Sequence, residues 1–215
     1  MNKFYEGCLF CAFQEQSSCE RCFECAEVWA LKEKWIHSLG FYYPRKIKEH
    51  RDSKWSKAIL IAKRNFKILS VFGRITAFYL NELEYLKPYT LTYVPEFQDD
   101  CWFNGFNMAR MEVLSNIIFS RLQDKRGVTI ERILVQVNKK RKKQRYCSTD
   151  KERFKNVNGA YLVLNPERIA GKNVVLIDDV LTSGATLKEC SDLLVNAGTR
   201  NVTGLVLAKT FRGGN

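Results

Sequence analysis

The chain has 215 residues, of which 46% are hydrophobic, and it carries a net charge of +12 from 35 basic and 23 acidic residues. This composition argues against a disordered chain, and no apolar run approaches the roughly 20 residues of a membrane-spanning helix. The length suits one α/β domain with a small appendage. The positive charge favours polyanionic partners, either phosphorylated small molecules or nucleic acid. The N-terminus lacks the apolar core of a signal peptide, so we expect a cytoplasmic protein.

Residues 1–30 are predicted to form a zinc-binding module. Five of the eight cysteines lie in the first 25 residues, spaced as two pairs plus one further cysteine. In a cytosolic chain this crowding indicates metal binding rather than disulfides, because two thiolate pairs on tight turns can close a tetrahedral shell around Zn²⁺. A site closed by four cysteines leaves no open position, so its role would be structural. The expected ligands are Cys8, Cys11, Cys22 and Cys25, with Cys19 as an alternative ligand.

Residues 31–88 are predicted to form a helical region that packs on the core. An aromatic stretch at Phe41–Pro44 indicates a short strand ended by a turn. Two helices are expected after it, over residues 53–64 and about 68–86, because their apolar residues recur at helical spacing.

Residues 89–215 are predicted to form the α/β core. The expected strands are short apolar runs, and a helix is expected from residue 104 to about 122, with another after residue 186. Apolar strands alternating with helices indicate a mainly parallel sheet with helices on both faces and right-handed connections. The strands are expected at Leu91–Val94, Ile133–Val137, Val174–Ile177 and Val202–Ala208.

The strand at Val174–Ile177 leads directly into two adjacent carboxylates and then into a small, hydroxyl-rich turn that opens a helix. Backbone N–H groups and hydroxyls at a helix N-terminus favour a phosphate, and the carboxylates can accept hydrogen bonds from the 2- and 3-hydroxyls of a ribose. Open α/β sheets bind their ligands beyond the carboxyl ends of the strands. This pattern predicts a site for a phosphorylated sugar, formed by Asp178, Asp179, Val180, Leu181, Thr182, Ser183, Gly184, Ala185 and Thr186.

The same segment resembles the phosphoribosyl-pyrophosphate (PRPP) signature of type I phosphoribosyltransferases, in which Asp/Glu-Asp is followed by Thr-Thr/Ser-Gly-x-Thr. The resemblance implies a type I phosphoribosyltransferase-like, Rossmann-like fold. It also implies displacement of pyrophosphate from C1 of PRPP through an oxocarbenium-like transition state. Asp178 and Asp179 would hold the ribose hydroxyls, directly or through Mg²⁺-bound water. No residue pattern indicates the acceptor.

Residues 139–145 contain six basic residues. The segment resembles the mobile catalytic loop of the phosphoribosyltransferase fold, which would cover and neutralise the departing pyrophosphate. Two other interpretations stay open, namely a solvated basic connector and a grip on the backbone of DNA or RNA. The catalytic candidates in this segment are Lys139, Lys140, Arg141 and Lys142.

The order of these features along the chain resembles the ComF family. The shared elements are the cysteine module, Val94-Pro95, Gly105-Phe106-Asn107, the basic loop, and Arg153 with the Asn156-Val157 pair that precedes the PRPP signature. Asn104 and Met108 replace an arginine and a glutamine of the family pattern. Residues 96–100 are acidic where the family is usually basic, and they would repel pyrophosphate unless Mg²⁺ intervenes.

Two functions therefore remain open. In the first, the chain is an enzyme that binds PRPP or a ribose 5-phosphate moiety with Mg²⁺ and transfers the phosphoribosyl group. In the second, it is a non-catalytic component of DNA uptake, as the ComF resemblance implies, and binds single-stranded DNA or a helicase-like partner. The intact PRPP signature favours the enzyme, and the acidic segment favours the second function.

Overall fold

The structure is a computed structural model, and it describes residues 36–83, 86–96, 108–137 and 146–211. The predicted zinc ligands Cys8, Cys11, Cys19, Cys22 and Cys25 lie outside the described residues, as do the basic residues 139–145. No helix in the described ranges is both long enough and apolar enough to cross a membrane.

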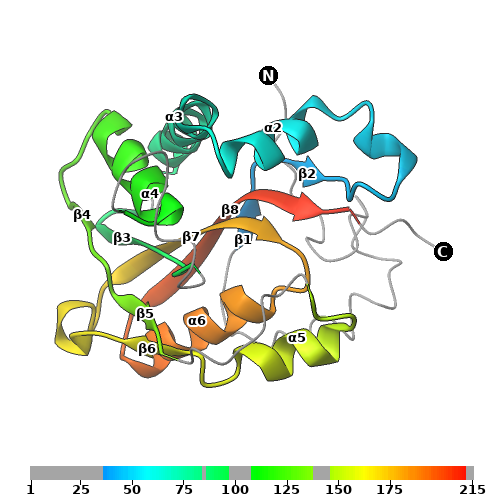
Figure 1. The fold of residues 1–215 in the computed structure, drawn as a ribbon. Helices are drawn as coiled ribbons and strands as arrows, with labels where there is room; N and C mark the ends of the chain where they lie inside the picture. The colour runs from blue at the N-terminus through cyan, green and yellow to red at the C-terminus, as the bar shows by residue number, and fades with distance from the viewer. Residues whose placement is uncertain (1–35, 84–85, 97–107, 138–145, 212–215) are drawn as a thin grey trace, which may run out of the picture.

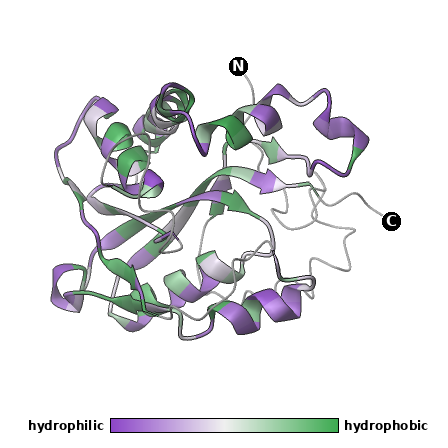
Figure 2. Cartoon of the chain, in the orientation of Figure 1, coloured by the Kyte–Doolittle hydropathy of each residue, from purple (hydrophilic) through white to green (hydrophobic). Residues whose placement is uncertain are grey.

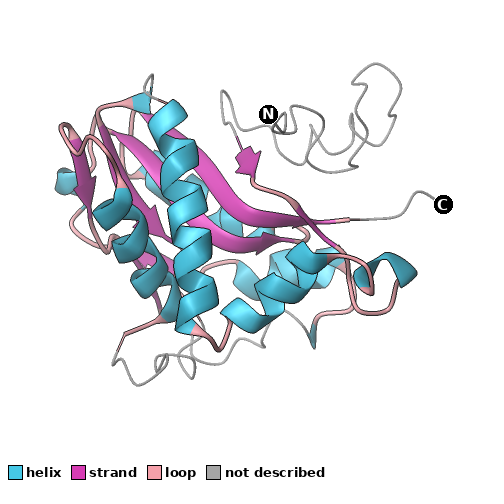
Figure 3. Cartoon of the chain, turned by 90° about the horizontal axis from the view of Figure 1, so that it is seen from above, coloured by secondary structure: helices cyan, strands magenta, loops and turns pink. Residues whose placement is uncertain are grey.

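A parallel sheet forms the centre of the molecule (Figures 1 and 3). All its pairings are parallel, which confirms the predicted mainly parallel sheet. Two of its inner strands are almost fully buried along their apolar stretches, as expected for strands that are covered on both faces. The strand order is β1 (Ile36–Ser38), β8 (Asn201–Thr210), β7 (Asn173–Leu181), β3 (Tyr89–Tyr93) and β4 (Val128–Ile130), and β2 (Phe41–Tyr42) also pairs with β8.

Helices cover both faces of this sheet (Figure 1). On one face lie α2 (Lys54–Ala62), α3 (Phe66–Glu82) and α4 (Arg110–Arg121). On the other face lies α6 (Ala185–Asn196), with α5 (Asp150–Val157) packed against it. A separate antiparallel pair, β5 (Leu134–Gln136) and β6 (Tyr161–Val163), contacts α6, and short 3-10 helices occur at Lys48–His50 and Pro166–Arg168.

The sheet divides the apolar core into two clusters, and Figure 2 shows hydrophobic residues concentrated along the central strands. Successive residues of a strand point to opposite faces. Accordingly, Val175 and Ile177 of β7 belong to the cluster under α2, α3 and α4, whereas Val174 and Leu176 belong to the cluster under α6. The apolar run of β7 therefore anchors both layers of helices beside the residues that follow it.

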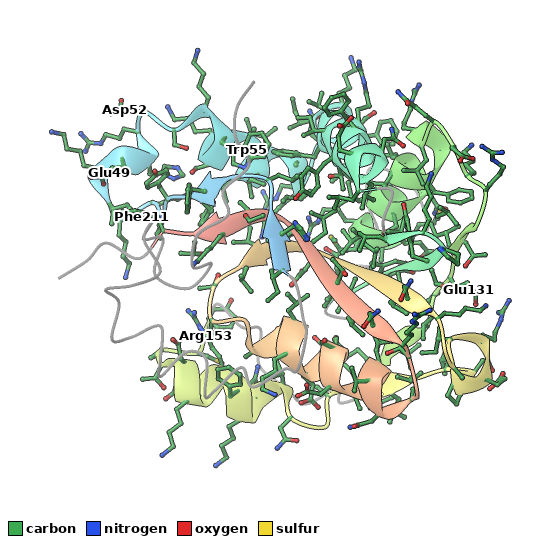
Figure 4. All side chains as sticks on the ribbon, turned by 180° about the vertical axis from the view of Figure 1, so that it is seen from behind. Glu49, Asp52, Trp55, Glu131, Arg153 and Phe211 are labelled. Carbon is green, nitrogen blue, oxygen red and sulfur yellow. The ribbon has the colours of Figure 1, made fainter. Side chains whose placement is uncertain are left out.

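Two contacts fix the helices on the first face. A Cβ at Gly73 of α3 would overlap Cγ2 of Ile117 and lie 3.0 Å from its Cβ, so glycine allows α3 and α4 to approach closely. Trp55 of α2, which Figure 4 labels, donates a hydrogen bond from Nε1 to the carbonyl of Leu207 at 3.1 Å. Its ring meets the ring of Phe72 edge-on. These contacts hold α2 against the carboxyl-terminal half of β8.

Three details differ from the sequence-based prediction. Helix α4 begins at Arg110 rather than at residue 104, because Ala109 is its N-cap and has an extended backbone. The strand predicted at 133–137 exists as β5, but it pairs with β6 outside the main sheet. The place beside β3 is taken by β4, whose three residues are too few to show a periodic pattern. The short strand expected at Phe41–Pro44 is present as β2, whereas β1 was not predicted.

Candidate functional site

A cavity of about 530 Å³ lies at the carboxyl edge of the sheet. The ends of β3 and β7, the turn that follows β7, and residues of α2, α4 and α5 line it. All nine predicted substrate-binding residues, 178–186, belong to its wall. The structure also brings Lys63, Glu96, Arg110 and Arg153 to the same cavity.

The turn after β7 presents the N-terminus of α6 to the cavity. Gly184 is the N-cap and has a φ of 77°, a left-handed conformation that favours glycine. The backbone N–H of Ala185 donates to Oγ of Ser183 at 3.3 Å, and the hydroxyls of Thr182 and Thr210 lie 3.0 Å apart. The first turn of α6 contains no acidic residue. Its N–H groups and macrodipole therefore favour an anion at this end of the cavity.

The two predicted carboxylates lie near the end of β7, which continues past them to Leu181. Oδ1 of Asp178 accepts the backbone N–H of Asp179 at 2.8 Å, and Oδ1 of Asp179 accepts the N–H of Val180 at 2.6 Å. Oδ2 of Asp179 also meets two cations, Nζ of Lys63 at 3.1 Å and Nη2 of Arg110 at 2.9 Å. Both acids are thus held by the adjacent backbone, and Asp179 is also held by cations at the ends of α2 and α4.

These contacts shift the pKa values of the two acids in opposite directions. Burial, together with the adjacent charge of Asp179, raises the pKa of Asp178 to about 7. Burial would also raise the pKa of Asp179, but the cations of Lys63 and Arg110 outweigh it and hold that pKa below its usual value. Asp179 therefore stays ionised at neutral pH, while Asp178 exchanges its proton near neutrality.

Glu96, the first residue of the predicted acidic segment, is neutralised by Arg110. Its Oε1 lies 2.6 Å from Nη2 of Arg110, and both side chains are only 11% exposed. Its Oε2 accepts the backbone N–H of Met111 at 3.3 Å, which caps α4 because the N-cap residue Ala109 offers no side-chain oxygen. Burial raises the pKa of Glu96, and the nearby guanidinium of Arg110 opposes this shift. The predicted repulsion from this carboxylate is therefore offset by a paired cation; the other residues of the segment, 97–100, lie outside the described residues.

The sequence did not predict Lys63 or Arg110 as site residues. Each stands at the end of an amphipathic helix, where a lone basic residue usually faces solvent, and only the packing of α2 and α4 brings both to β7. Arg153, named in the sequence pattern, lies on α5 and lines the cavity from the opposite face (Figure 4). The candidates Lys139, Lys140, Arg141 and Lys142 lie outside the described residues.

The acid pair and the turn lie in the part of the chain that matches a known domain model. Residues 112–212 match the model of the phosphoribosyl transferase domain. The α/β fold, with its mostly parallel sheet, is phosphoribosyltransferase-like, as the sequence predicted.

Two solved structures that resemble the chain are crystal forms of a hypoxanthine phosphoribosyltransferase from Staphylococcus aureus. The tetragonal form has 13% identity and a TM-score of 0.41, and the match covers 66% of this chain and 62% of that one. The orthorhombic form has 12% identity and a TM-score of 0.40, with 68% and 75% covered. This chain thus spans less than two thirds of the length of the first of them. No match was found among curated proteins.

Proposed function

We propose that this chain binds PRPP with Mg²⁺ and transfers its phosphoribosyl group with release of pyrophosphate. The observation that carries the proposal is the cavity at the carboxyl edge, which joins Asp178 and Asp179 to the turn 182–186 at the start of α6. Both features fall inside the region that matches the phosphoribosyl transferase domain. A lone acidic pair or a lone helix N-terminus would not support this function, whereas the two in one cavity suit the two ends of a ribose 5-phosphate.

Each part of the cavity has a role in this reaction. The turn and the N-terminus of α6 hold the 5-phosphate, and the two acids accept hydrogen bonds from the 2- and 3-hydroxyls. When the bond from C1 to pyrophosphate breaks, positive charge develops on the ribose ring. We expect the ionised Asp179 beside the ribose to help stabilise this charge. The bond to the acceptor forms at C1 as pyrophosphate leaves, and no general base is demanded if Mg²⁺ makes pyrophosphate a good leaving group.

The acid pair also fits Mg²⁺ that enters with the substrate. Mg²⁺ usually takes one or two protein carboxylates and completes its shell with water and substrate oxygens. Among residues 36–83, 86–96, 108–137 and 146–211, no group of three or more metal-ligating side chains occurs. We expect Asp178 and Asp179 to hold the metal together with oxygens of the ligand. Bound there, Mg²⁺ would neutralise the diphosphate and make it a better leaving group.

Calorimetric titration with PRPP and Mg²⁺ tests the proposal. The wild-type chain should bind, and the double variant Asp178→Asn/Asp179→Asn should lose binding. Asp52→Asn, in the turn before α2 and remote from the cavity, is the matched control and should bind as the wild type does. Absence of binding by the wild type would refute the proposed function.

A second candidate function is supported by the net charge of +12 and by the six basic residues within 139–145. In this proposal the chain is a ComF-like component of DNA uptake that binds single-stranded DNA or a helicase-like partner. Affinity for single-stranded DNA should then fall steeply with salt, because each phosphate contact releases counterions. Replacing Lys139, Lys140, Arg141 and Lys142 by glutamine should flatten that slope. A flat response of the wild type would remove electrostatic DNA binding.

We also propose a structural zinc ion at the N-terminal cysteines, on the strength of their spacing alone. Metal analysis should find about one zinc per chain, since four thiolates form a closed tetrahedral site. The alternative ligand is tested by comparing two serine variants. If Cys22 is a ligand and Cys19 is not, Cys22→Ser releases zinc while Cys19→Ser retains it.

A further inference from the structure

We propose that Lys63 and Arg110 form the subsite for the diphosphate of the ligand. The inference rests on the proposed function and adds to it the residues that recognise the leaving group. Neither residue belongs to the signature segment, and both come from helices on the face of the sheet opposite α6 (Figure 1).

The orientation of the ligand follows from the layers of the fold. The turn 182–186 opens α6 on one face of the sheet, and the cations approach Asp179 from α2 and α4 on the other. In a ribose, the 2- and 3-hydroxyls share one edge of the ring, while C1 and the carbon that carries C5 flank the ring oxygen at opposite ends. With the hydroxyls at the acids and the 5-phosphate at the turn, the substituent on C1 must point toward Lys63 and Arg110.

Charge supports the same assignment. Lys63 and Arg110 pair with two carboxylates of the site, those of Asp179 and Glu96. A diphosphate bound here adds negative charge, and it would interact with the same two cations as the carboxylates. Such a group is best recognised by arginine, whose planar guanidinium can donate two parallel hydrogen bonds to phosphate oxygens.

The two cations can also reach a ligand without breaking the site. Within the described part of the chain, both ion pairs of Arg110 use the same nitrogen, Nη2, which leaves Nη1 and Nε as the donors to offer a ligand in the cavity that Arg110 lines. The side chain of Lys63 is 44% exposed and flexible, and it can move from Asp179 toward a phosphate. Arg110 is thus a fixed donor and Lys63 a mobile one.

Comparing the binding of two ligands shows whether Lys63 and Arg110 recognise the diphosphate or support the site in general. PRPP carries the diphosphate, whereas ribose 5-phosphate lacks it and shares the remaining groups. Calorimetry with Mg²⁺ should show that Lys63→Met and Arg110→Met each weaken PRPP binding at least about tenfold, as expected for loss of a charge-assisted hydrogen bond. Binding of ribose 5-phosphate should weaken much less than binding of PRPP, because it lacks the diphosphate and every variant keeps the acids and the turn that hold its other groups.

Three further variants sharpen the test. Lys67→Met, an exposed residue of α3, removes the same charge away from the cavity and should leave both affinities unchanged. Arg110→Lys should retain more PRPP affinity than Arg110→Met, because it keeps the charge. Glu96→Gln removes an anion that competes for Arg110 and should tighten PRPP binding, a change of opposite sign to that expected from loss of a structural contact.

The outcomes are distinguishable. If the variants lose both ligands equally, or lose neither, the subsite is refuted while the proposed function stands. If the wild type binds neither ligand, the proposed function fails and the subsite fails with it. Lys63 is half-exposed at the end of α2, so its variant decides the question even if Arg110→Met does not fold.

Discussion

The acid at position 178 should make the stability of this protein fall as the pH rises. Burial and the neighbouring Asp179 raise the pKa of Asp178 from 3.8 to about 7 in the folded state. The folded protein therefore holds this proton more tightly than the unfolded chain does. The resulting stability is fully present below about pH 4 and is lost as the pH rises through about 7. Between pH 5 and pH 8, linkage assigns roughly 2 to 3 kcal/mol to this one group.

Burial also raises the pKa of Glu96, which adds a loss of the same sign, but Glu96 is present in both the wild type and Asp178→Asn. The lowered pKa of Asp179 contributes stability that is present throughout this range and disappears only at acid pH. Burial lowers the pKa of His37, so its contribution rises rather than falls between pH 5 and pH 8. The difference between wild type and Asp178→Asn therefore isolates the group at 178.

Urea unfolding at pH 5 and pH 8 measures the effect. We expect the wild type to lose stability, relative to Asp178→Asn, by about 2 to 3 kcal/mol across this interval. Asp52→Asn, an exposed substitution, should track the wild type. Parallel pH profiles for the wild type and Asp178→Asn would show that the carboxylate at 178 titrates as it does in the unfolded chain, and the division of roles between the two acids would be wrong.

Three further substitutions probe the packing that supports the site, each followed by urea unfolding. Gly73→Ala should destabilise the protein by about 1 to 3 kcal/mol through overlap with Ile117. Adding Ile117→Ala should restore part of the lost stability. An unchanged urea midpoint for Gly73→Ala would contradict the close approach of α3 and α4. Thr149→Ala should cost about 1 kcal/mol by removing the capping box of α5, while Thr149→Ser should retain it. Gly184→Ala should cost about 1 kcal/mol of stability, because the backbone of the N-cap of α6 is left-handed. The same substitution should weaken PRPP binding. Equal PRPP binding by Gly184→Ala and the wild type would argue against a phosphate at this turn.

The acid pair and the turn could be predicted from sequence because they are local. A buried strand, two acids and the start of α6 follow one another within residues 173–186, so their side chains reach one edge of the sheet without help from distant parts of the chain. The same locality explains the success with α2, α3 and β8, whose apolar patterns show their periods directly.

The cations of the site could not be found in this way. Arg110 and Lys63 meet Asp179 across 69 and 116 positions of sequence, a meeting that exists only after α2 and α4 pack on the sheet. From the sequence, Glu96 belongs to a repulsive acidic segment, because nothing near it in the chain indicates that Arg110 pairs with it. Likewise, β4 and β6 have three residues each, too few for a pattern to emerge, and their pairing depends on neighbours distant in the chain.

The way these charges are shared also decides which variants report on binding and which report on folding. Glu96, Arg110 and Asp179 are at most 16% exposed, so removing Arg110 leaves Glu96 as a nearly buried charge without its paired cation, whereas removing Glu96 or Asp179 leaves Arg110 one carboxylate. Such an orphaned charge is strongly destabilising, and the loss of stability would accompany any loss of affinity. Lys63 differs because its ammonium group is half in solvent, where an ion pair contributes at most about 1 kcal/mol to stability. A variant at Lys63 therefore changes the charge that faces the ligand while leaving the fold intact, which makes it the position where the chemistry of this cavity can be read most directly.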